Sequence, residues 1–441
     1  MIQQRHKKIV VYSHDTYGLG NMRRMLVIAR ALVDSDPNLS VLILSGSPML
    51  HAFRISPRID YIKLPCLTRT MSGDYEAKSL NLAHNQILRM RSNLIRNSII
   101  DFDPDLILVD KKPFGVADEL ANAFNDLKRL GHRAKLVLLL RDILDSAETT
   151  MQIWRKNAYH QAIDSFYDQV LVVGSPEIFD LCKEYEFPAK SRQKVRFCGY
   201  IAREAGRTSR QLTRQKYGCD TKKLILVTPG GGEDGFQLLK SYVQGWQEQG
   251  GIENAKTLVI CGPEMKENHR NEILSRIGDS HDIVLENFTD DMMAYMDAAD
   301  LVISMGGYNT VCEILTLGKR AIVVPRVTPV LEQWIRAKRM DSLGLLRALH
   351  PDEMTPSSLL ATVRGELARP FYINSSTHFN INLDGLASIC RSIHTLMMND
   401  AVVASLVVNK PKNIHPVNRQ EVKADYILGY GSGLYAQYSS V

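Results

Sequence analysis

The sequence lacks a long apolar run. A transmembrane helix needs roughly 18 consecutive apolar residues, and no stretch of the 441-residue chain comes close to that length. Near its start, "MIQQRHKKIVVYSHD" holds an apolar stretch that is too short for the core of a signal peptide. We therefore expect a cytoplasmic protein that is soluble or at most peripheral to the inner face of a membrane.

Cysteines are few, and they do not occur in closely spaced pairs. The chain has seven cysteines, an odd number, and no two of them form a Cys-x-x-Cys motif. This usage is typical of reduced thiols and argues against a disulfide framework or a structural zinc site. We accordingly expect no bound metal.

The charge is not concentrated in one region. The 54 basic and 48 acidic residues give a net charge of +6, and the excess is spread along the chain without a basic tail. This pattern does not indicate nucleic acid as a partner. An anionic ligand or an anionic membrane surface explains the excess equally well.

What the chain does have is an alternation of strand-like and helix-like segments. Short β-rich runs bounded by turn residues recur with amphipathic stretches between them, which indicates parallel sheets with helices on both faces. One series of runs covers 8–13, 39–46, 104–110, 134–142 and 168–174, and a second covers 223–232, 256–262, 282–288, 300–307 and 320–326.

A polar, glycine-containing stretch after Tyr200 separates the two series. The sequence therefore predicts two doubly wound α/β domains, at 1–200 and 201–395. A final segment, 396–441, is expected to hold a C-terminal helix and a flexible tail.

Two glycine-rich turns in the second domain are suited to binding an anion. "SMGGYNT", Ser304 to Thr310, ends a strand and opens a helix, so backbone N–H groups and the helix dipole face any ligand placed there. "TPGGGEDG", from Thr228 to Gly235, follows the first strand of the same domain. It is not a Walker loop, and on its own it is equally consistent with a tight turn.

The stretch from Glu286 to Leu345 resembles the donor-binding half of GT-B glycosyltransferases. It is similar to the peptidoglycan N-acetylglucosaminyltransferase MurG and to plant-type UDP-glycosyltransferases. The resemblance rests on Phe288 before an acidic turn, on "GYNT" from Gly307 with Glu313 after it, and on Glu332-Gln333. It implies a GT-B fold, in which two Rossmann-like domains face each other across a cleft.

The same resemblance implies a donor site for a nucleotide-sugar, most simply a UDP-sugar, with no cofactor and no metal. Glu313 would accept the ribose hydroxyls. The other implied contacts are Phe288 and Thr289 to the base, Glu332 and Gln333 to the sugar, Gly306, Gly307, Asn309 and Thr310 to the diphosphate, and Gly231 and Gly232 to the phosphate or sugar. Met305 stands where retaining GT-B enzymes usually place a glutamate, which implies inversion.

On the acceptor side, the turn "SHDTYGLGNMRR" follows the first strand of the chain. In many inverting relatives a Gly-His pair lies here and the histidine is the general base. Gly20-Asn21 aligns with that pair, and asparagine cannot take up a proton. His14 is our first choice of base and Asp15 the second, while Asn21 is also a good N-cap for the following helix.

Further residues of the acceptor side lie at strand ends, where α/β sheets place ligands. Asp110 resembles the aspartate that orients the base in plant-type relatives. The remaining acceptor-side predictions are Gly18, Gly20, Arg141 and Asp142.

The predicted function is thus that of an inverting, metal-independent glycosyltransferase. It would move a sugar from a nucleotide-sugar to a hydroxyl of an acceptor, which the sequence leaves open between a lipid-linked molecule and a saccharide. Two alternatives remain: an isomerase like UDP-N-acetylglucosamine 2-epimerase, and a catalytically degenerate protein that only binds a nucleotide-sugar.

Overall fold

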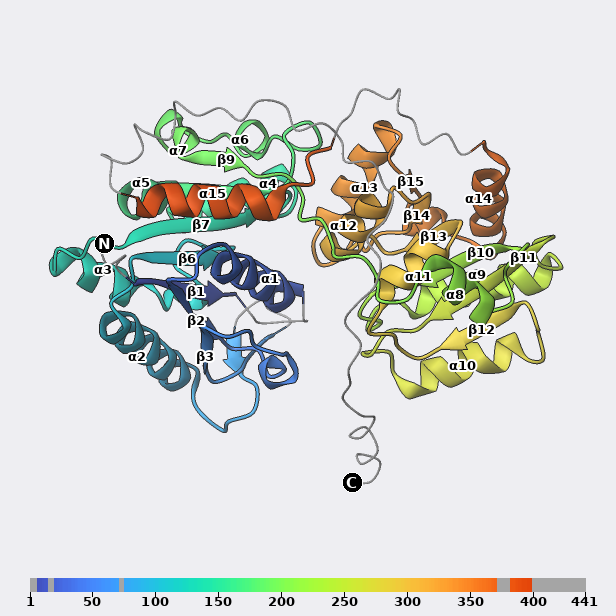
Figure 1. Cartoon of the computed structure of the whole chain (residues 1–441), viewed down its shortest axis with the longest axis horizontal. Coiled ribbons are helices and arrows are strands. Elements are labelled where there is room, and N and C mark those ends of the chain that lie inside the picture. Colours follow the sequence, from blue (N-terminus) through green and yellow to red (C-terminus); the bar gives the residue numbers. More distant parts are fainter. Residues whose placement is uncertain (1–5, 15–19, 71–74, 371–380, 399–441) are drawn as a thin grey trace. The chain divides into compact units, whose positions relative to one another are not determined.

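The computed structural model of the chain describes residues 6–14, 20–70, 75–370 and 381–398. These residues form two parallel β-sheets, each with helices on its two faces, and a small antiparallel pair (Figure 1). Among them, no helix is both long and apolar enough to cross a membrane.

The first sheet is wholly parallel, and its strand order reverses beside β1. In spatial order it consists of β3 (Ile59–Lys63), β2 (Leu39–Ser45), β1 (Lys7–Ser13), β6 (Leu106–Asp110), β7 (Lys135–Arg141), β8 (Gln169–Val173) and β9 (Val195–Phe197). The antiparallel pair is β4 (Leu67–Arg69) with β5 (Tyr75–Ala77).

The second sheet is also parallel, and its order reverses beside β10. It consists of β12 (Ile283–Glu286), β11 (Ala255–Ile260), β10 (Lys223–Thr228), β13 (Leu301–Ser304), β14 (Ala321–Val323) and β15 (Arg347–Ala348). Such a switch point is where α/β sheets bind ligands, outside the carboxyl ends of the strands.

Helices connect the strands of both sheets. Those up to β9 are α1 (Gly20–Ser35), η1 (Leu50–Ala52), α2 (His84–Phe102), η2 (Val116–Asp118), α3 (Ala121–Arg129), α4 (Ala147–Lys156), α5 (Tyr159–Phe166), α6 (Leu181–Glu184) and α7 (Ala189–Gln193). Those after β9 are α8 (Arg210–Lys216), α9 (Phe236–Glu248), α10 (Glu267–Ile277), α11 (Met292–Ala298), α12 (Tyr308–Leu317), α13 (Glu332–Ser342), η3 (Pro351–Glu353), α14 (Pro356–Ala368) and α15 (Gly385–Met397).

The central strands are apolar on both faces because helices cover both. The side chains of Ile9 to Tyr12 in β1 and of Leu106 to Val109 in β6 are fully buried. Continuous runs of this kind are typical of parallel strands in doubly wound sheets. The strand runs predicted in the two series are confirmed by β1, β2, β6, β7, β8 and β10 to β14.

Helix α15 returns to the first sheet. In Figure 1 it lies among elements of the amino-terminal half, and it packs on α1. Arg196 Nη1 donates to Ser392 Oγ at 3.2 Å, and Ser35 Oγ lies 2.9 Å from His394 Nε2. The division at residues 200 and 395 stays a prediction, and the residues from 399 onward lie outside the described part of the chain.

Candidate functional site

Two loops of the second sheet lie side by side at the carboxyl ends of the neighbouring strands β10 and β13. Gly230 and Gly232 have φ angles of +91° and +99°, a backbone conformation that glycine adopts without strain. A Cβ atom placed on Gly230 would lie 3.8 Å from Oγ1 of Thr310, in the first turn of α12. The predicted phosphate turns are thus adjacent in space.

The start of α12 is open to a ligand. Gly306 has a φ of +68°, and a Cβ atom there would overlap Val323 Cγ1, so this position requires glycine. Gly307 is the N-cap, and a Cβ atom on it would meet nothing within 4 Å. No side chain of the described residues caps the helix, which leaves its first-turn N–H groups free to bind an anion.

Glu313 follows one turn into α12 and is half-buried. Burial raises the pKa of its carboxyl to about 7, while the charges of Arg203 and Arg23 act in the opposite direction. Arg203 is fixed close by, since its Nη2 donates to Oδ1 of Asn309 at 2.5 Å. Arg203 therefore lies beside the site predicted from "GYNT" and Glu313, and the sequence did not assign it there.

Phe288 and Thr289 lie in the loop that follows β12. The Phe288 side chain is 49% exposed, so its ring is accessible to a ligand. The Thr289 hydroxyl accepts the N–H of Asp291 at 3.1 Å, which orders the turn before α11.

Glu332 and Gln333, the predicted sugar contacts, already have partners in the protein. Glu332 is buried at the start of α13 and pairs with Arg141, at 2.9 Å between Oε2 and Nη2. Gln333 Oε1 accepts the N–H of Arg326 at 3.0 Å. A sugar contact at these residues stays a prediction, and it would require Glu332 to share Arg141 with the ligand.

His14, the first choice of base, lies just past β1 and is only 1% exposed. Burial and the nearby charges of Lys111 and Lys112 hold the pKa of its imidazole well below the usual value, so the ring is neutral at pH 7. Its Nδ1 has no hydrogen-bond partner among the described residues. Asp15 and Gly18 lie outside the described residues.

Asn21 lies inside the first turn of α1, because this helix begins at Gly20. An N-cap residue directly precedes its helix, and Asn21 does not, so Asn21 is not the N-cap of α1. Its Nδ2 donates to the backbone oxygen of His14 at 2.8 Å, and its Oδ1 accepts from Arg24 Nη2 at 3.3 Å. Asn21 thus fixes the loop that carries His14.

Asp110 pairs with a buried arginine. Its Oδ1 lies 2.7 Å from Arg24 Nη2, and both side chains are almost fully buried. Its Oδ2 accepts the backbone N–H of His14 at 3.4 Å, not the imidazole N–H. In this structure Asp110 therefore orients the His14 backbone and balances Arg24.

The carboxyl ends of the two sheets meet through α12 and α13. Tyr308, in the first turn of α12, donates its hydroxyl to the backbone oxygen of Val173 at the end of β8, at 3.0 Å. Arg336 of α13 pairs with Asp142, directly after β7. Asp142 and Arg141 thus contact the second half of the chain, a role that their predicted placement on the acceptor side did not include.

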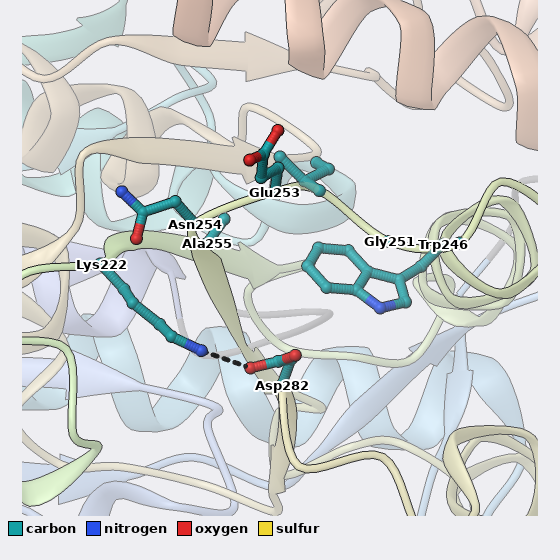
Figure 2. Close-up of a pocket in the computed structure, with 9 residues that line it drawn as sticks. Lys222, Trp246, Gly251, Glu253, Asn254, Ala255 and Asp282 are labelled. Atoms are coloured by element: carbon teal, nitrogen blue, oxygen red, sulfur yellow. Dashed lines mark hydrogen bonds and ion pairs between the residues drawn. The ribbon is translucent and has the colours of Figure 1, made fainter.

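A cavity of about 410 Å³ lies at the amino ends of the strands of the second sheet, whereas the glycine loops lie at the carboxyl ends. Figure 2 shows Trp246 and the Lys222–Asp282 ion pair among its lining residues. Lys222 precedes β10 and Asp282 precedes β12, so this cavity adjoins the amino ends of the strands. It is separate from the glycine loops.

Within the described part of the chain, no three His, Cys, Asp or Glu side chains gather as a metal ion would require.

Comparison with known proteins agrees with this architecture. Residues 224–379 match the family model of the glycosyltransferase family 28 C-terminal domain. The UDP-N-acetylglucosamine–N-acetylmuramyl-(pentapeptide) pyrophosphoryl-undecaprenol N-acetylglucosamine transferase of Alkaliphilus metalliredigens is 27% identical over 193 residues, which are 42% of this chain and 51% of that protein. The chain thus spans about half the length of this relative.

Solved structures are similar over nearly the whole chain. Acinetobacter baumannii MurG has a TM-score of 0.53 at 15% identity, with 91% of this chain and 98% of that chain covered. A putative UDP-N-acetylglucosamine 2-epimerase from Listeria monocytogenes has a TM-score of 0.60 at 13% identity, with 92% and 98% covered.

These likenesses define the fold as that of the GT-B glycosyltransferases. Within it, residues 224–379 are similar to the glycosyltransferase family 28 C-terminal domain, and part of the chain is similar to MurG-type transferases.

Proposed function

We propose that this protein is an inverting glycosyltransferase that takes a nucleotide-sugar, most simply a UDP-sugar, and needs no metal. The observation that supports it most is the adjacency of the Gly230–Gly232 loop to the open start of α12. Together they offer backbone N–H groups and a helix dipole where the diphosphate leaves.

Glu313 would hold the ribose and Phe288 would stack on the base. Glu313 lies one turn beyond the proposed diphosphate position. Its half-buried carboxylate would be stabilised by hydrogen bonds from the two ribose hydroxyls. The exposed ring of Phe288 would lose its solvent contact on stacking.

The acceptor would bind the first half of the chain, near His14 and the strand ends around it. The MurG relatives carry pyrophosphoryl-undecaprenol in their names, which supports a lipid-linked acceptor. With such an acceptor the protein would work at the surface of a membrane, for which the sequence predicts the inner face. A saccharide remains the other candidate.

The first test is turnover. The protein is incubated with a panel of nucleotide-sugars, with and without lipid-linked or cell-extract acceptors, and release of nucleoside diphosphate is followed together with the sugar product. Acceptor-dependent release with an inverted anomeric centre supports the proposal. Absence of nucleotide binding, with a Glu313→Ala variant indistinguishable from wild type, contradicts it.

The epimerase alternative is kept because of the Listeria structure, whose likeness covers almost the whole chain. It predicts that a new sugar forms from UDP-N-acetylglucosamine without any acceptor. Binding without turnover would instead support the degenerate binding protein, for which Asn21 at the place of the usual histidine is the motivating observation.

A further inference from the structure

A small cavity of about 220 Å³ lies at the edge of the first sheet where the acceptor is proposed to bind. Its walls come from the loop that follows β6, from β5, from the start of α2 and from the junction of α4 and α5. The loop begins directly after Asp110, whose Oδ2 accepts the backbone N–H of His14. The cavity therefore adjoins the carboxyl end of β6, the side on which α/β sheets bind ligands.

Backbone strain is concentrated around this cavity. Ala117 and Asp118, with φ angles of +46° and +58°, line it, and Ala158, with a φ of +51°, lies between the lining residues Asn157 and Tyr159. Residues other than glycine enter this left-handed region only at a cost in free energy, and alanine has no polar side chain that could offset it. Such conformations persist where the surrounding structure imposes them, and they cluster at functional sites.

A buried polar network holds the loop after β6 in place. The Tyr12 hydroxyl accepts the N–H of Val116 at 2.9 Å and donates to Glu119 Oε1 at 2.6 Å. Arg91 in turn binds both carboxylate oxygens of Glu119, from Nε at 2.6 Å and from Nη2 at 2.7 Å. A Cβ atom on Gly115 would lie 2.8 Å from the Tyr12 hydroxyl oxygen, so this close approach requires glycine. The strained loop is thus held by side chains that are themselves buried.

The cavity presents charged groups that the described chain does not pair. Lys112 Nζ lies 3.5 Å from the Tyr75 hydroxyl and 5.8 Å from the centroid of its ring, and no carboxylate of the described residues forms an ion pair with it. The exposed carboxylate of Asp118 likewise has no cation partner among the described residues. His84 donates from Nδ1 to the backbone oxygen of Tyr75, which leaves Nε2 of the neutral ring as an acceptor.

This combination of groups suits a sugar. Hydroxyls both donate and accept, so one sugar ring can pair with an ammonium, a carboxylate and an imidazole, and its apolar face can pack on the Tyr75 ring. An anionic ligand would meet the charge of Asp118, and a lipid chain would leave the polar groups unpaired. The volume is below the roughly 300 Å³ at which pockets for drug-sized ligands begin, so a single sugar unit is the size that fits.

We propose that this cavity binds a sugar unit of the acceptor, and that Lys112 and Asp118 determine which sugar is accepted. The inference rests on the proposed function and narrows its acceptor to a molecule that contains a saccharide, whether or not a lipid carries it. Because the buried network fixes the loop, the ammonium and the carboxylate are held in a set geometry before the ligand arrives. Such preorganisation lets them select a sugar by the positions of its hydroxyls.

The experiment measures the binding of methyl glycosides of glucose, galactose, mannose, N-acetylglucosamine and N-acetylmuramic acid by ligand-observed NMR titration. It uses the whole chain as wild type, Lys112→Gln and Asp118→Asn, with and without UDP. Both variants remove a charge that has no ion-pair partner among the described residues, so they should fold normally. Asp101→Asn is the matched control, because Asp101 is an exposed aspartate near the end of α2, whereas His84 of the cavity lies at its start.

Wild type should bind at least one of the five glycosides. Lys112→Gln and Asp118→Asn should each lose about 10-fold or more of that affinity, as expected for hydrogen bonds to charged groups, and Asp101→Asn should match wild type. Failure of all five glycosides to bind, or binding that neither cavity variant weakens, would overturn the inference.

Calorimetry with UDP tests the proposed function separately. UDP affinity should be the same in wild type and in the three variants, because the cavity belongs to the acceptor side. Binding of UDP without binding of any glycoside would leave the proposed function standing and remove the cavity assignment. Binding of a glycoside that Lys112→Gln and Asp118→Asn weaken, without binding of UDP, would support the cavity as a sugar site and contradict the proposed function.

Discussion

Arg336 holds both carboxylate oxygens of Asp142, with Nε at 2.7 Å from Oδ2 and Nη2 at 2.8 Å from Oδ1. Both side chains are 0% exposed. The Tyr200 hydroxyl donates to the same carboxylate at 2.8 Å, and the Arg336 guanidinium lies 5.7 Å from the centroid of the Tyr308 ring. A buried ion pair thus joins α13 to the end of β7.

Removal of Arg336 should destabilise the protein strongly. In Arg336→Ala the carboxylate of Asp142 would stay buried without its main partner, which costs roughly 3 to 5 kcal/mol. Arg339→Ala is the matched control, since Arg339 of the same helix pairs with Glu184 at 2.8 Å but is half exposed. That exposed pair should contribute less than about 1 kcal/mol. Urea unfolding measures both, and equal losses in the two variants would contradict the role of the buried pair.

The two glycines before α12 should respond differently to alanine. Gly306→Ala combines a left-handed φ of +68° with an overlap on Val323, so it should lower the melting temperature clearly. Gly307→Ala meets no neighbour within 4 Å and should leave the melting temperature nearly unchanged. Its methyl group would occupy space beside the proposed diphosphate, so UDP affinity should fall.

Thermal unfolding and UDP calorimetry on the two variants separate these effects. A Gly307→Ala protein that binds UDP as well as wild type would argue against a close approach of the diphosphate at this turn. Loss of folding in Gly307→Ala would mean that the space around this residue is occupied by the chain itself.

Much of the fold could be predicted from the sequence because its strands carry strong local signals. Uniform apolar runs such as Ile9 to Tyr12 can only be buried on both faces. The short edge strand β9 and the two-residue β15 carry no such pattern, and both were missed. The return of α15 to α1 depends on tertiary packing that no local pattern contains.

The candidate site was predictable only where a motif is continuous. "GYNT" with Glu313 places a whole helix start, and the structure brings it beside the glycine loop. Arg203 and Arg336 are isolated arginines in the sequence, and their partners, Asn309 and Asp142, lie far away along the chain. A helix opened by two consecutive arginines, Arg23 and Arg24, was the one available signal, and it does not reveal that Arg24 is buried against Asp110.

Nucleoside binding should strengthen with rising pH through the titration of Glu313. If only the carboxylate accepts the ribose hydroxyls, a pKa of about 7 leaves it mostly protonated at pH 6 and mostly ionised at pH 8. Affinity for uridine should then rise about tenfold between these values. Uridine is the right probe because it has no phosphate to titrate in this range. Glu313→Gln should bind uridine more weakly at pH 8 and remove the pH dependence, and a flat wild-type profile would contradict the assignment.

Stability above pH 8 should increase through Lys111. Burial and the charge of Arg141 lower the pKa of its ammonium to about 8, from 10.5. Between these values the unfolded chain binds more protons than the folded one, so this residue makes the protein more stable as the pH rises from about 8 toward 10.5. Lys111→Met should raise stability at pH 7 by up to about 3 kcal/mol and remove that contribution. Urea unfolding at pH 7 and 9.5 measures how the free energy of unfolding changes between these values, with Lys128→Met on α3 as the control. The prediction is contradicted if this change is the same in Lys111→Met as in wild type.

The question of the base is best tested at Asn21 and His14 together. His14 is neutral at pH 7 but buried, and its low pKa makes it a weak proton acceptor. Asn21 lies next to Gly20, which faces Asn309 of the proposed donor site, so a histidine there would stand closer to the reacting sugar.

Asn21→His should therefore raise the transfer rate by about 10-fold or more, within the range that a general base contributes. His14→Gln should lower the wild-type rate while leaving that of Asn21→His largely unaffected. If His14→Gln changes neither rate, His14 is not the base, and if Asn21→His gives no gain, the turn at the start of α1 does not face the acceptor hydroxyl.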